Sequence, residues 1–562
     1  MSTTDRDSVY ESEDDEFAEF NWLEQMDGQI KFTSPADSST KQIGYCNGKL
    51  IRRDRIHSFY DDMEEPTPET SQVAFDLFDR YGRLRKEFKE HSIKKGSGIW
   101  GDELDQGDLL LFEHLIVEKP YRRRGLGCKV VNAMLEKTRQ KSDHFFAIVS
   151  PGYLTREVEK ETRGLTSEEV KEIEEREGRA ARDFWRSLGF RRIGSSRWFA
   201  IASDKGHQCH SLSALNDFDP PLPPNRKAYP DVEPLLKDMA TIEDPKWDGK
   251  IKEMFQSLSA SDSHWWATDD EGNTVLHVAA KNSKPQSVEW ILSQNSQLLN
   301  CLNNEGETPL EALEFHLESG RTKRGTNYMT KIDHISDKFK GFSDKSVMCL
   351  IKLKGIADAS PAEVLRLTYG CTCGQCIAGF LSRRMRFALQ CQAELQYDML
   401  NFDLEGGNGK DFVACNGDQL RFVPNSVREN LKTNKSMREG FTELCLHFAT
   451  CIKKDNIHGL PIQEHILLAL QEATEWPPVS RNFLQRGGTI FSVASMIFEA
   501  AMNQDRFAGD GEHFENLHEQ ILQLPECRND HEFGFVSAMC GYKRVGSIRY
   551  ISVWTGEEIE SD

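Results

Sequence analysis

The fold of this chain is decided by the stretch Leu109-Leu-Leu-Phe-Glu-His-Leu-Ile-Val117 and, three residues further on, by Tyr121-Arg-Arg-Arg-Gly-Leu-Gly-Cys128. The first run is apolar apart from one acid and one histidine, and it has the length of a buried β-strand. The second run carries two glycines, and a helical apolar pattern follows over residues 129–138. A strand, a glycine turn and a helix thus come in direct succession, which indicates an α/β unit.

The chain on either side of this stretch continues the alternation of strands and helices. Downstream, a strand, a charged helical run and a second strand are predicted at residues 145–149, 155–182 and 198–201. Upstream, residues 42–53 predict a strand or a β-hairpin around Asn47-Gly48, because Asn-Gly is a favoured two-residue turn. Between this segment and the central strand, a stripe of apolar side chains predicts a helix over residues 69–90.

The composition sets the class of protein and its size. The 562 residues correspond to three or four domains of average length. A formal net charge of −20 opposes binding to a phosphate backbone, so we exclude a general nucleic-acid coat protein and do not expect nucleic acid as a partner. No apolar run reaches the roughly 20 residues of a membrane span, and the acidic N-terminus does not resemble a secretory signal. We therefore expect an intracellular protein of the cytoplasm, the nucleus or both, with no membrane partner.

Changes in composition along the chain predict five segments. Residues 1–40 are acidic and then rich in serine and threonine, which predicts a disordered tail. Prolines gather between residues 220 and 230 and mark an extended linker. The expected order is an acidic tail (1–40), an α/β domain (41–203), a Pro-rich linker (204–240), a repeat-bearing segment (241–345) and a mainly helical segment with cysteines (346–562).

The glycine turn has the chemistry of an anion site. Glycines at positions 125 and 127 allow backbone N–H groups to converge on one point, and the following helix adds the positive end of its dipole. Such a site suits a pyrophosphate. The turn is not a Walker A loop, because Gly-Lys-Ser/Thr is absent, and it is not a dinucleotide-binding fingerprint, because that pattern needs a third glycine.

Two motifs in this region carry a family resemblance. The stretch Val117-Glu-Lys-Pro-Tyr-Arg-Arg-Arg-Gly-Leu-Gly127 resembles motif A of the GNAT N-acetyltransferases. The stretch Phe184-Trp-Arg-Ser-Leu-Gly-Phe190 resembles their motif B. Both occur in the family's order beside the expected strands, and the resemblance covers residues 42–202, which is under a third of the chain.

The resemblance implies a mixed sheet with flanking helices that binds acetyl-CoA in a V between two splayed parallel strands. It further implies an N-acetyltransferase, in which the amine of a small molecule or protein substrate attacks the thioester directly. The pyrophosphate is expected on the glycine turn and the pantetheine along the first strand. The implied cofactor-binding residues are Leu115, Val117, Arg122, Arg123, Arg124, Gly125, Leu126, Gly127 and Cys128.

The resemblance also suggests catalytic residues. Glu113 stands where the family commonly has the glutamate that serves as base. Trp185 replaces the tyrosine that commonly protonates the leaving thiolate, and indole cannot act as an acid at neutral pH. Tyr153 is therefore our candidate for that step.

Other interpretations of the same residues remain open. Glu113 could face solvent or pair with an arginine, Tyr153 could be an ordinary surface tyrosine, and the arginine triplet could be a solvated face. Trp185, together with Gly178 in place of a frequent cofactor-binding asparagine, favours a second hypothesis. In that hypothesis the chain is a non-catalytic, protein-binding scaffold with a degenerate CoA-binding fold.

A repeat follows the linker. Asp270-Glu-Gly-Asn-Thr-Val-Leu-His-Val-Ala-Ala280 recurs in part as Asn304-Glu-Gly-Glu-Thr-Pro-Leu-Glu-Ala312, with an offset of 34 residues. This pattern resembles ankyrin repeats. We expect Thr274 to cap a helix and His277 to hydrogen-bond the neighbouring turn. Two copies are fewer than the about three that a solenoid needs, so helices near residues 247–258 and 346–354 are expected to cap the stack.

The resemblance to ankyrin repeats implies a protein partner, because ankyrin surfaces bind other proteins. The alternative is that the stack serves as an internal spacer packed on the other domains.

The last segment combines a cysteine cluster with amphipathic helices. Cys371-Thr-Cys-Gly-Gln-Cys376 contains the Cys-x-x-Cys spacing of a zinc knuckle. No second pair of ligands lies at a standard distance, and cysteine is often a buried apolar residue. We therefore predict packed thiols and no metal, with zinc as the alternative. Helices are predicted at residues 378–400, 437–452, 463–472 and 491–502, and the segment resembles a domain after the ankyrin repeats of uncharacterised fungal proteins, which implies no activity.

Overall fold

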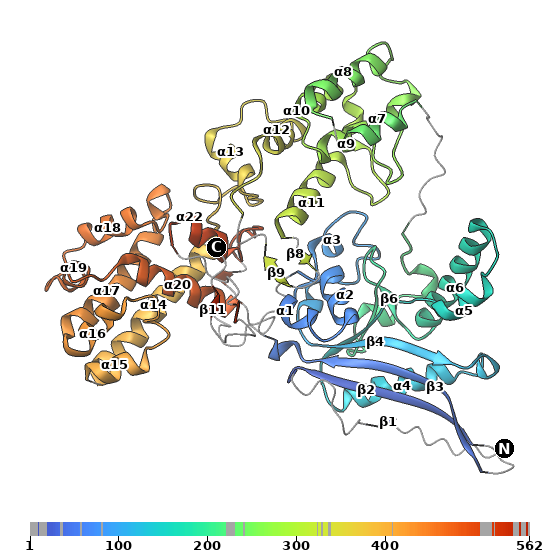
Figure 1. Cartoon of the computed structure of the whole chain (residues 1–562), viewed down its shortest axis with the longest axis horizontal. Helices are drawn as coiled ribbons and strands as arrows, with labels where there is room; N and C mark the ends of the chain where they lie inside the picture. Colours follow the sequence, from blue (N-terminus) through green and yellow to red (C-terminus); the bar gives the residue numbers. More distant parts are fainter. Residues whose placement is uncertain are drawn as a thin grey trace. The chain divides into compact units, whose positions relative to one another are not determined.

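A computed structural model shows the architecture of the chain (Figure 1). It describes residues 9–10, 20–33, 38–56, 59–79, 82–220, 231–239, 242–322, 324–327, 330–334, 339–406, 408–505, 520–521, 523–542, 550–551 and 558–559. The chain divides into two compact units, one built mainly from residues 1–222 and the other from residues 223–505 and 514–562. The division falls inside the predicted linker of residues 204–240, of which residues 221–230 lie outside the described part.

The first unit contains a mixed seven-stranded sheet in the order β1-β2-β3-β4-β5-β7-β6. Neighbouring strands are antiparallel except for β4 and β5, which are parallel. The strands are β1 (Val9–Tyr10), β2 (Leu23–Thr33), β3 (Thr40–Ile51), β4 (Asp108–Val117), β5 (Phe145–Val149), β6 (Arg191–Arg192) and β7 (Phe199–Ala202). The predicted α/β character of this region is confirmed, with the central strand and the strand at 145–149 where the sequence placed them.

The predicted acidic tail of residues 1–40 is wrong for its second half. Residues 23–33 form β2, which pairs with β3 from Leu23 opposite Ile51 to Thr33 opposite Thr40. Met26, Gly28 and Ile30 are buried, and Asp27 and Gln29 between them are more exposed, as expected for a strand with one face on the core. The surrounding acids dominate the composition and conceal this alternation.

Of the two structures predicted for residues 42–53, a strand or a hairpin, the strand is confirmed and the hairpin is wrong. β3 runs without a turn through Asn47-Gly48, because it pairs with β2 on one side and β4 on the other. The Asn47 amide donates to Asp27 Oδ1 at 2.6 Å. At Gly48, a Cβ atom would lie 2.9 Å from the carbonyl oxygen of Leu111, so the close approach of β4 requires glycine there.

Helices cover both faces of the sheet. Helix α4 (Leu126–Arg139) packs against β2, β3 and β4, and Figure 1 shows α1 and α2 on the opposite side of the sheet. The other helices of this unit are α1 (Phe59–Glu64), α2 (Pro68–Leu77), α3 (Lys86–Lys89), α5 (Thr155–Glu161) and α6 (Ser167–Ser187). The helix predicted over residues 69–90 ends at residue 77, because Phe78 is extended and bridges to Leu84 around Gly82, whose φ is +75°.

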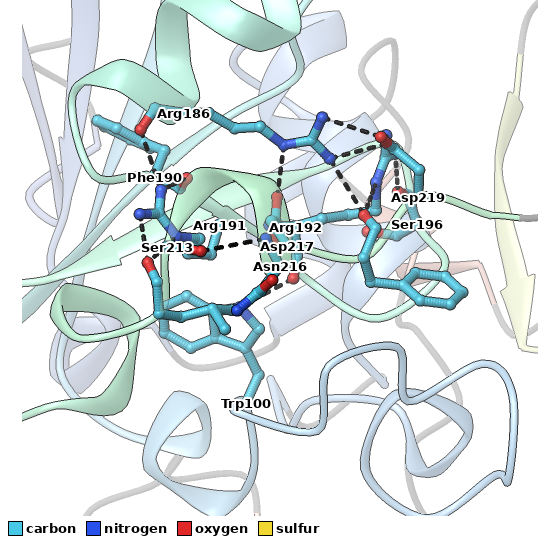
Figure 2. A network of polar contacts seen from close by, with 12 residues as sticks. Trp100, Arg186, Phe190, Arg191, Arg192, Ser196, Ser213, Asn216, Asp217 and Asp219 are labelled. Carbon is cyan, nitrogen blue, oxygen red and sulfur yellow. Dashed lines mark hydrogen bonds and ion pairs between the residues drawn. The ribbon is translucent and has the colours of Figure 1, made fainter.

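The first half of the predicted linker is part of the first unit. Figure 2 shows the contacts: Asp217 accepts a 2.7 Å hydrogen bond from Arg186 Nε, and Asp219 accepts from both Arg186 and Arg192 at 2.7 to 2.9 Å. Arg186 lies in α6 and Arg192 in β6. The Arg192 backbone N–H also donates to Asp217. These contacts, in which Asp217 and both arginines are buried, fasten residues 203–219 to the end of the sheet.

This network leads to a stability prediction. Asp217→Ala removes the innermost partner of the Arg186 guanidinium but keeps Asp219, which should cost about 1–3 kcal/mol. We expect a lower melting temperature of the full chain and faster amide exchange over residues 203–219. Asp204→Ala is the matched control, because Asp204 is exposed and accepts from a nearby backbone N–H. Equal effects of the two substitutions would contradict the role of the network.

The second unit begins with a short helical stack. Its helices are α7 (Glu233–Asp238), α8 (Asp244–Phe255), α9 (Val275–Lys281), α10 (Pro285–Gln294), α11 (Pro309–Thr322) and α12 (Asp344–Leu353). Both α8 and α12 contact α10, as expected for helices that cap the stack. Gly272 and Gly306 both have positive φ, and a Cβ on Gly272 would lie 2.4 Å from the Asn304 side chain. The two repeat turns are therefore stacked directly on each other.

The buried His277 links the two repeats. Its Nε2 lies 2.9 Å from the Glu307 carbonyl oxygen, which can only accept, so Nε2 carries the proton. Nδ1 then accepts from the Thr274 backbone N–H at 3.2 Å and lies 2.9 Å from the Thr274 hydroxyl. Both expected contacts, the helix cap and the bond to the neighbouring turn, are present. Burial lowers the pKa of His277 below its ordinary value, so the ring is neutral.

His277 should make stability depend on pH. Because its pKa is lowered by folding, the unfolded chain takes up a proton first as the pH falls. The stabilisation is fully present well above the unfolded pKa of about 6.5 and declines as the pH falls below it, by at most about 1.4 kcal/mol per pH unit. We expect His277→Asn to lose part of this decline in urea unfolding of the full chain at pH 7.5 and 5.5. His264→Gln, at a partly exposed histidine, should keep the decline, and an unchanged pH dependence in His277→Asn would contradict the assignment.

The rest of the second unit is helical around its own core. The four predicted helices are confirmed as α14 (Arg383–Gly406), α17 (Lys435–Ile452), α18 (Gln463–Glu472) and α20 (Ile490–Asp505). The remaining elements are α13 (Pro361–Thr368), α15 (Gly409–Cys415), α16 (Asn425–Thr433), α19 (Val479–Gln485), α22 (Phe533–Met539) and the short strands β8 (Arg324–Asn327), β9 (Thr330–His334), β10 (Tyr550–Ile551) and β11 (Glu558–Ile559).

Candidate functional site

The parallel strands β4 and β5 separate half-way along β4. Pairing runs from Asp108 opposite Phe145 to Phe112 opposite Val149, where β5 ends. β4 continues to Val117 and remains paired with β3 on its other side. Within the described residues, the edge of β4 from residue 113 to 117 thus has no ladder partner on the β5 side. An open strand edge of this kind is available to a ligand that carries amide groups.

A β-bulge stands at the point of separation. Asn47 is opposite His114 and Gly48 is opposite Phe112, so Glu113 is an extra residue in β4. A bulge bends its strand, increases the local twist and turns side chains to new directions. Glu113 contacts Lys49 and Thr67 on the side of α2, whereas Leu115 lies on the α4 side near Gly127. The bulge therefore explains both the fork in the sheet and the change of face along β4.

The glycine turn lies at the N-terminus of α4. Gly125 is the N-cap residue with φ of +75°, and no described side chain caps the helix there. Among the described atoms, none lies within 4 Å of a Cβ placed on Gly125. The first backbone N–H groups of the helix, from Leu126 to Cys128, thus have no side-chain cap among the described residues. This is the arrangement that favours an anion.

Gly127 lies at a close contact between the two motifs. A Cβ on Gly127 would lie 3.2 Å from the Phe184 ring of α6 and 3.7 Å from Leu115. Trp185, next to Phe184, is buried and packs against Phe112 and Phe190 with ring centroids 5.3 and 4.9 Å apart. The second motif therefore packs against the turn, and it fills the core beside Phe112, the last residue of β4 that pairs with β5.

The three arginines of the turn have different roles. Arg122 donates to the Val117 carbonyl oxygen at 2.7 Å and forms a two-fold ion pair with Glu157 at 2.6 and 3.0 Å. This pairing lowers the pKa of Glu157 and ties the turn to β4 and α5. Arg123 and Arg124 are exposed, and Arg124 donates to the Pro120 carbonyl oxygen at 3.1 Å. Arg122 is thus a structural brace, and the two exposed guanidiniums remain close to the open turn.

Glu113 lies in a buried ion pair. Its side chain is 7% exposed and the Lys49 side chain 4%, and the Lys49 ammonium donates to a Glu113 carboxylate oxygen. The Thr67 hydroxyl, at the N-cap of α2, lies 3.5 Å from the same oxygen. Glu113 therefore neither faces solvent nor pairs with an arginine, the alternatives that the sequence left open. Sequence reasoning missed Lys49. The one indication was that it is a single charged residue within the apolar end of β3.

Tyr153 lies in the segment that follows β5. Its hydroxyl hydrogen-bonds Glu174 of α6, and this bond raises the pKa of Tyr153 above its ordinary value. The phenol is therefore protonated at neutral pH and is able to donate. Glu113 belongs to β4 and Tyr153 to the segment after β5, so the two candidate catalytic residues come from different parts of the fold.

A second cluster of chemically active side chains lies in the second unit. The described part of the chain holds one group of acids, histidines or cysteines with metal-site geometry, formed by Cys371, Cys373, Cys376 and Cys527. The sequence identified the first three thiols but not the fourth, which follows Cys376 by 151 residues. Our prediction of no metal rested on the lack of a fourth ligand at a standard distance, and the fold supplies that ligand from a remote segment.

Comparisons with known proteins identify one part of the chain. The family model described as ankyrin repeats, many copies, matches residues 267–312, which include α9 and α10. The second unit therefore contains ankyrin repeats, the class of module that presents a protein-binding surface. No curated protein and no solved structure matches the chain. Among the helices of the described residues, none has the length and apolar character needed to cross a membrane.

Proposed function

We propose that the first unit is an acetyl-CoA-dependent N-acetyltransferase of the GNAT type and that the ankyrin repeats bring it to a protein partner or substrate. The observation that carries this proposal is the fork between β4 and β5 beside an uncapped glycine turn. The fork supplies an unpaired strand edge, and the turn supplies backbone N–H donors at a helix N-terminus. These are the two features that the V-shaped cofactor site of that family needs.

The residues present fit the cofactor. The open space at Gly125 leaves room for a pyrophosphate on the N–H groups of residues 125–128, with Arg123 and Arg124 as nearby cations. The free edge of β4 over residues 113–117 offers backbone donors and acceptors to pantetheine amides. When bound, acetyl-CoA supplies an activated acetyl group. Arg122 holds the turn in place rather than binding phosphate, because Glu157 already neutralises it.

Glu113 is the proposed base. Its carboxylate would accept the proton of the substrate ammonium, so that the neutral amine can attack the thioester, and the ion pair with Lys49 holds the carboxylate in place at the bulge. The bulge directs Glu113 to the α2 side of the fork, so we propose that the acceptor amine enters from that side. Tyr153 is the proposed donor to the leaving thiolate, for which its bond to Glu174 must open.

A second candidate is a CoA-binding scaffold without turnover. Trp185 favours it, because the indole is packed in the core and cannot donate a proton to a thiolate. The Lys49–Glu113 pair also has a purely structural interpretation. Binding of the cofactor would then accompany protein recruitment by the repeats, and the two candidates differ in whether acetyl-CoA is consumed.

Cofactor binding can be tested at the glycine turn. We expect acetyl-CoA to stabilise the full chain, by about 2.7 kcal/mol at 100 times Kd, and Gly125→Glu to abolish this shift in melting temperature. The carboxylate would occupy the open space and repel the pyrophosphate.

The matched control is Gly164→Glu. Gly164 has a similar φ of +85° and open space around it, but it lies between α5 and α6. It should keep the acetyl-CoA shift while losing similar intrinsic stability. An absence of any shift at millimolar acetyl-CoA in the unmodified chain would remove the cofactor assignment.

Turnover can be tested at Glu113. Thiol release from acetyl-CoA, measured with polyamines, arylalkylamines and lysine-containing peptides, should fall by about 10²–10⁴-fold in Glu113→Gln. The acetyl-CoA melting shift should persist, because the substitution leaves the backbone edge of β4 intact.

Glu118→Gln is the control for this measurement, because Glu118 follows the last residue of the same strand and makes an exposed ion pair with Lys41. It should leave the rate unchanged. Binding of acetyl-CoA without thiol release for any amine would favour the scaffold instead.

A further inference from the structure

Four thiols of the second unit lie in the arrangement of a metal centre. Successive sulfurs are 3.7 Å apart from Cys371 to Cys373, 3.8 Å from Cys373 to Cys376 and 3.5 Å from Cys376 to Cys527. All six distances are within 4.8 Å. Four sulfurs bound at 2.3 Å around one tetrahedral zinc are about 3.8 Å apart. We propose that these cysteines bind one Zn²⁺ ion in a closed, structural site.

Disulfide formation and simple packing account less well for this geometry. All four cysteines are free, and the shortest sulfur–sulfur distance of 3.5 Å is far from the roughly 2.05 Å of a disulfide bond. Packed thiols would be surrounded by apolar side chains, yet backbone N–H groups point at these sulfurs. Thr372 donates to Cys527 and Gln375 to Cys373, each at 3.4 Å. Such donors stabilise the negative charge of metal-bound thiolates.

The chain around the cluster is shaped for chelation. Gly374 has φ of +69°, which lets the backbone turn between Cys373 and Cys376 so that both sulfurs meet. Cys376 and Cys527 are buried and the other two are partly buried. Four sulfur ligands complete a tetrahedron and leave no position for substrate, so the ion would hold the fold rather than catalyse. Binding joins four thiolates to the ion and releases the protons of those thiols that were protonated.

The site would fasten a distant segment to the end of the ankyrin stack. Asn529, two residues after Cys527, accepts from Arg321 of α11 at 2.7 Å and donates to the Tyr369 carbonyl oxygen at 3.0 Å. The Arg321 side chain is fully buried. Helix α22, which follows, buries Phe535 in the helical core. Zinc would therefore tie together the end of the repeats, the cysteine loop and α22.

The test is metal analysis of the purified full chain. We expect one equivalent of zinc, less than half an equivalent in Cys527→Ser, and full occupancy in Cys415→Ser, whose thiol is exposed and outside the cluster. Less than half an equivalent in the unmodified chain, with four titratable thiols or a disulfide, would overturn the proposal. Bound iron would overturn the assignment to zinc, because four thiolates also suit iron.

A second measurement does not depend on the folding of a variant. Release of the ion from the unmodified chain by a mercurial reagent, with zinc captured by a chromogenic chelator, should yield one equivalent. Exchange with Co²⁺ should give the visible bands of a tetrahedral cobalt tetrathiolate. Chelation should then speed amide exchange over residues 371–376 and 523–542 but not over β4. Unchanged exchange in those two segments would refute the structural role.

Discussion

One extra residue in β4 is the constraint on which the first unit depends. With Glu113 inserted, β4 cannot keep regular register with both neighbours. β3 follows it past the bulge to Val117, while pairing with β5 stops at Phe112. The open edge, the placement of Glu113 toward α2 and the turn of Leu115 toward α4 all derive from that insertion. The Lys49 ammonium then makes a buried carboxylate tolerable at the bulge, since an unpaired charge there would be costly.

Features with a local cause are the ones that the sequence predicts well. The strand at β5 and the helix at α18 occur with the predicted bounds, because apolar periodicity and flanking polar residues are properties of neighbouring positions. The bulge has no such signal. A strand that is buried on both faces is a continuous apolar run with no polar–apolar alternation. An added residue therefore leaves no visible change in its pattern. Strand β2 was missed for a different reason. The acidic composition of the surrounding segment outweighed the alternation of buried and exposed residues along the strand.

The same distinction applies to the candidate sites. The glycine turn can be predicted from the sequence, since its two glycines directly precede a helix. The partners of Glu113 and Cys376 cannot be predicted in this way. Lys49 meets Glu113 because of the strand register, and Cys527 meets Cys376 because of the packing of a whole helical core. Arg122 illustrates the same limit. Its position in the motif suggests a phosphate ligand, and the fold adds a partner for its guanidinium, Glu157 of α5, that the motif does not reveal.

The separation of Cys376 and Cys527 has a consequence for synthesis. Cys527, the fourth thiol of the cluster, leaves the ribosome 151 residues after Cys376. At about 5–20 residues per second this is roughly 8 to 30 s later. During that interval the Cys371-x-Cys-x-x-Cys376 loop is an incomplete chelator, open to oxidants and to competing metals. A nascent chain that stops before residue 527 can never close the cluster. The fourth cysteine thereby makes completion of the helical core a condition for protecting the other three.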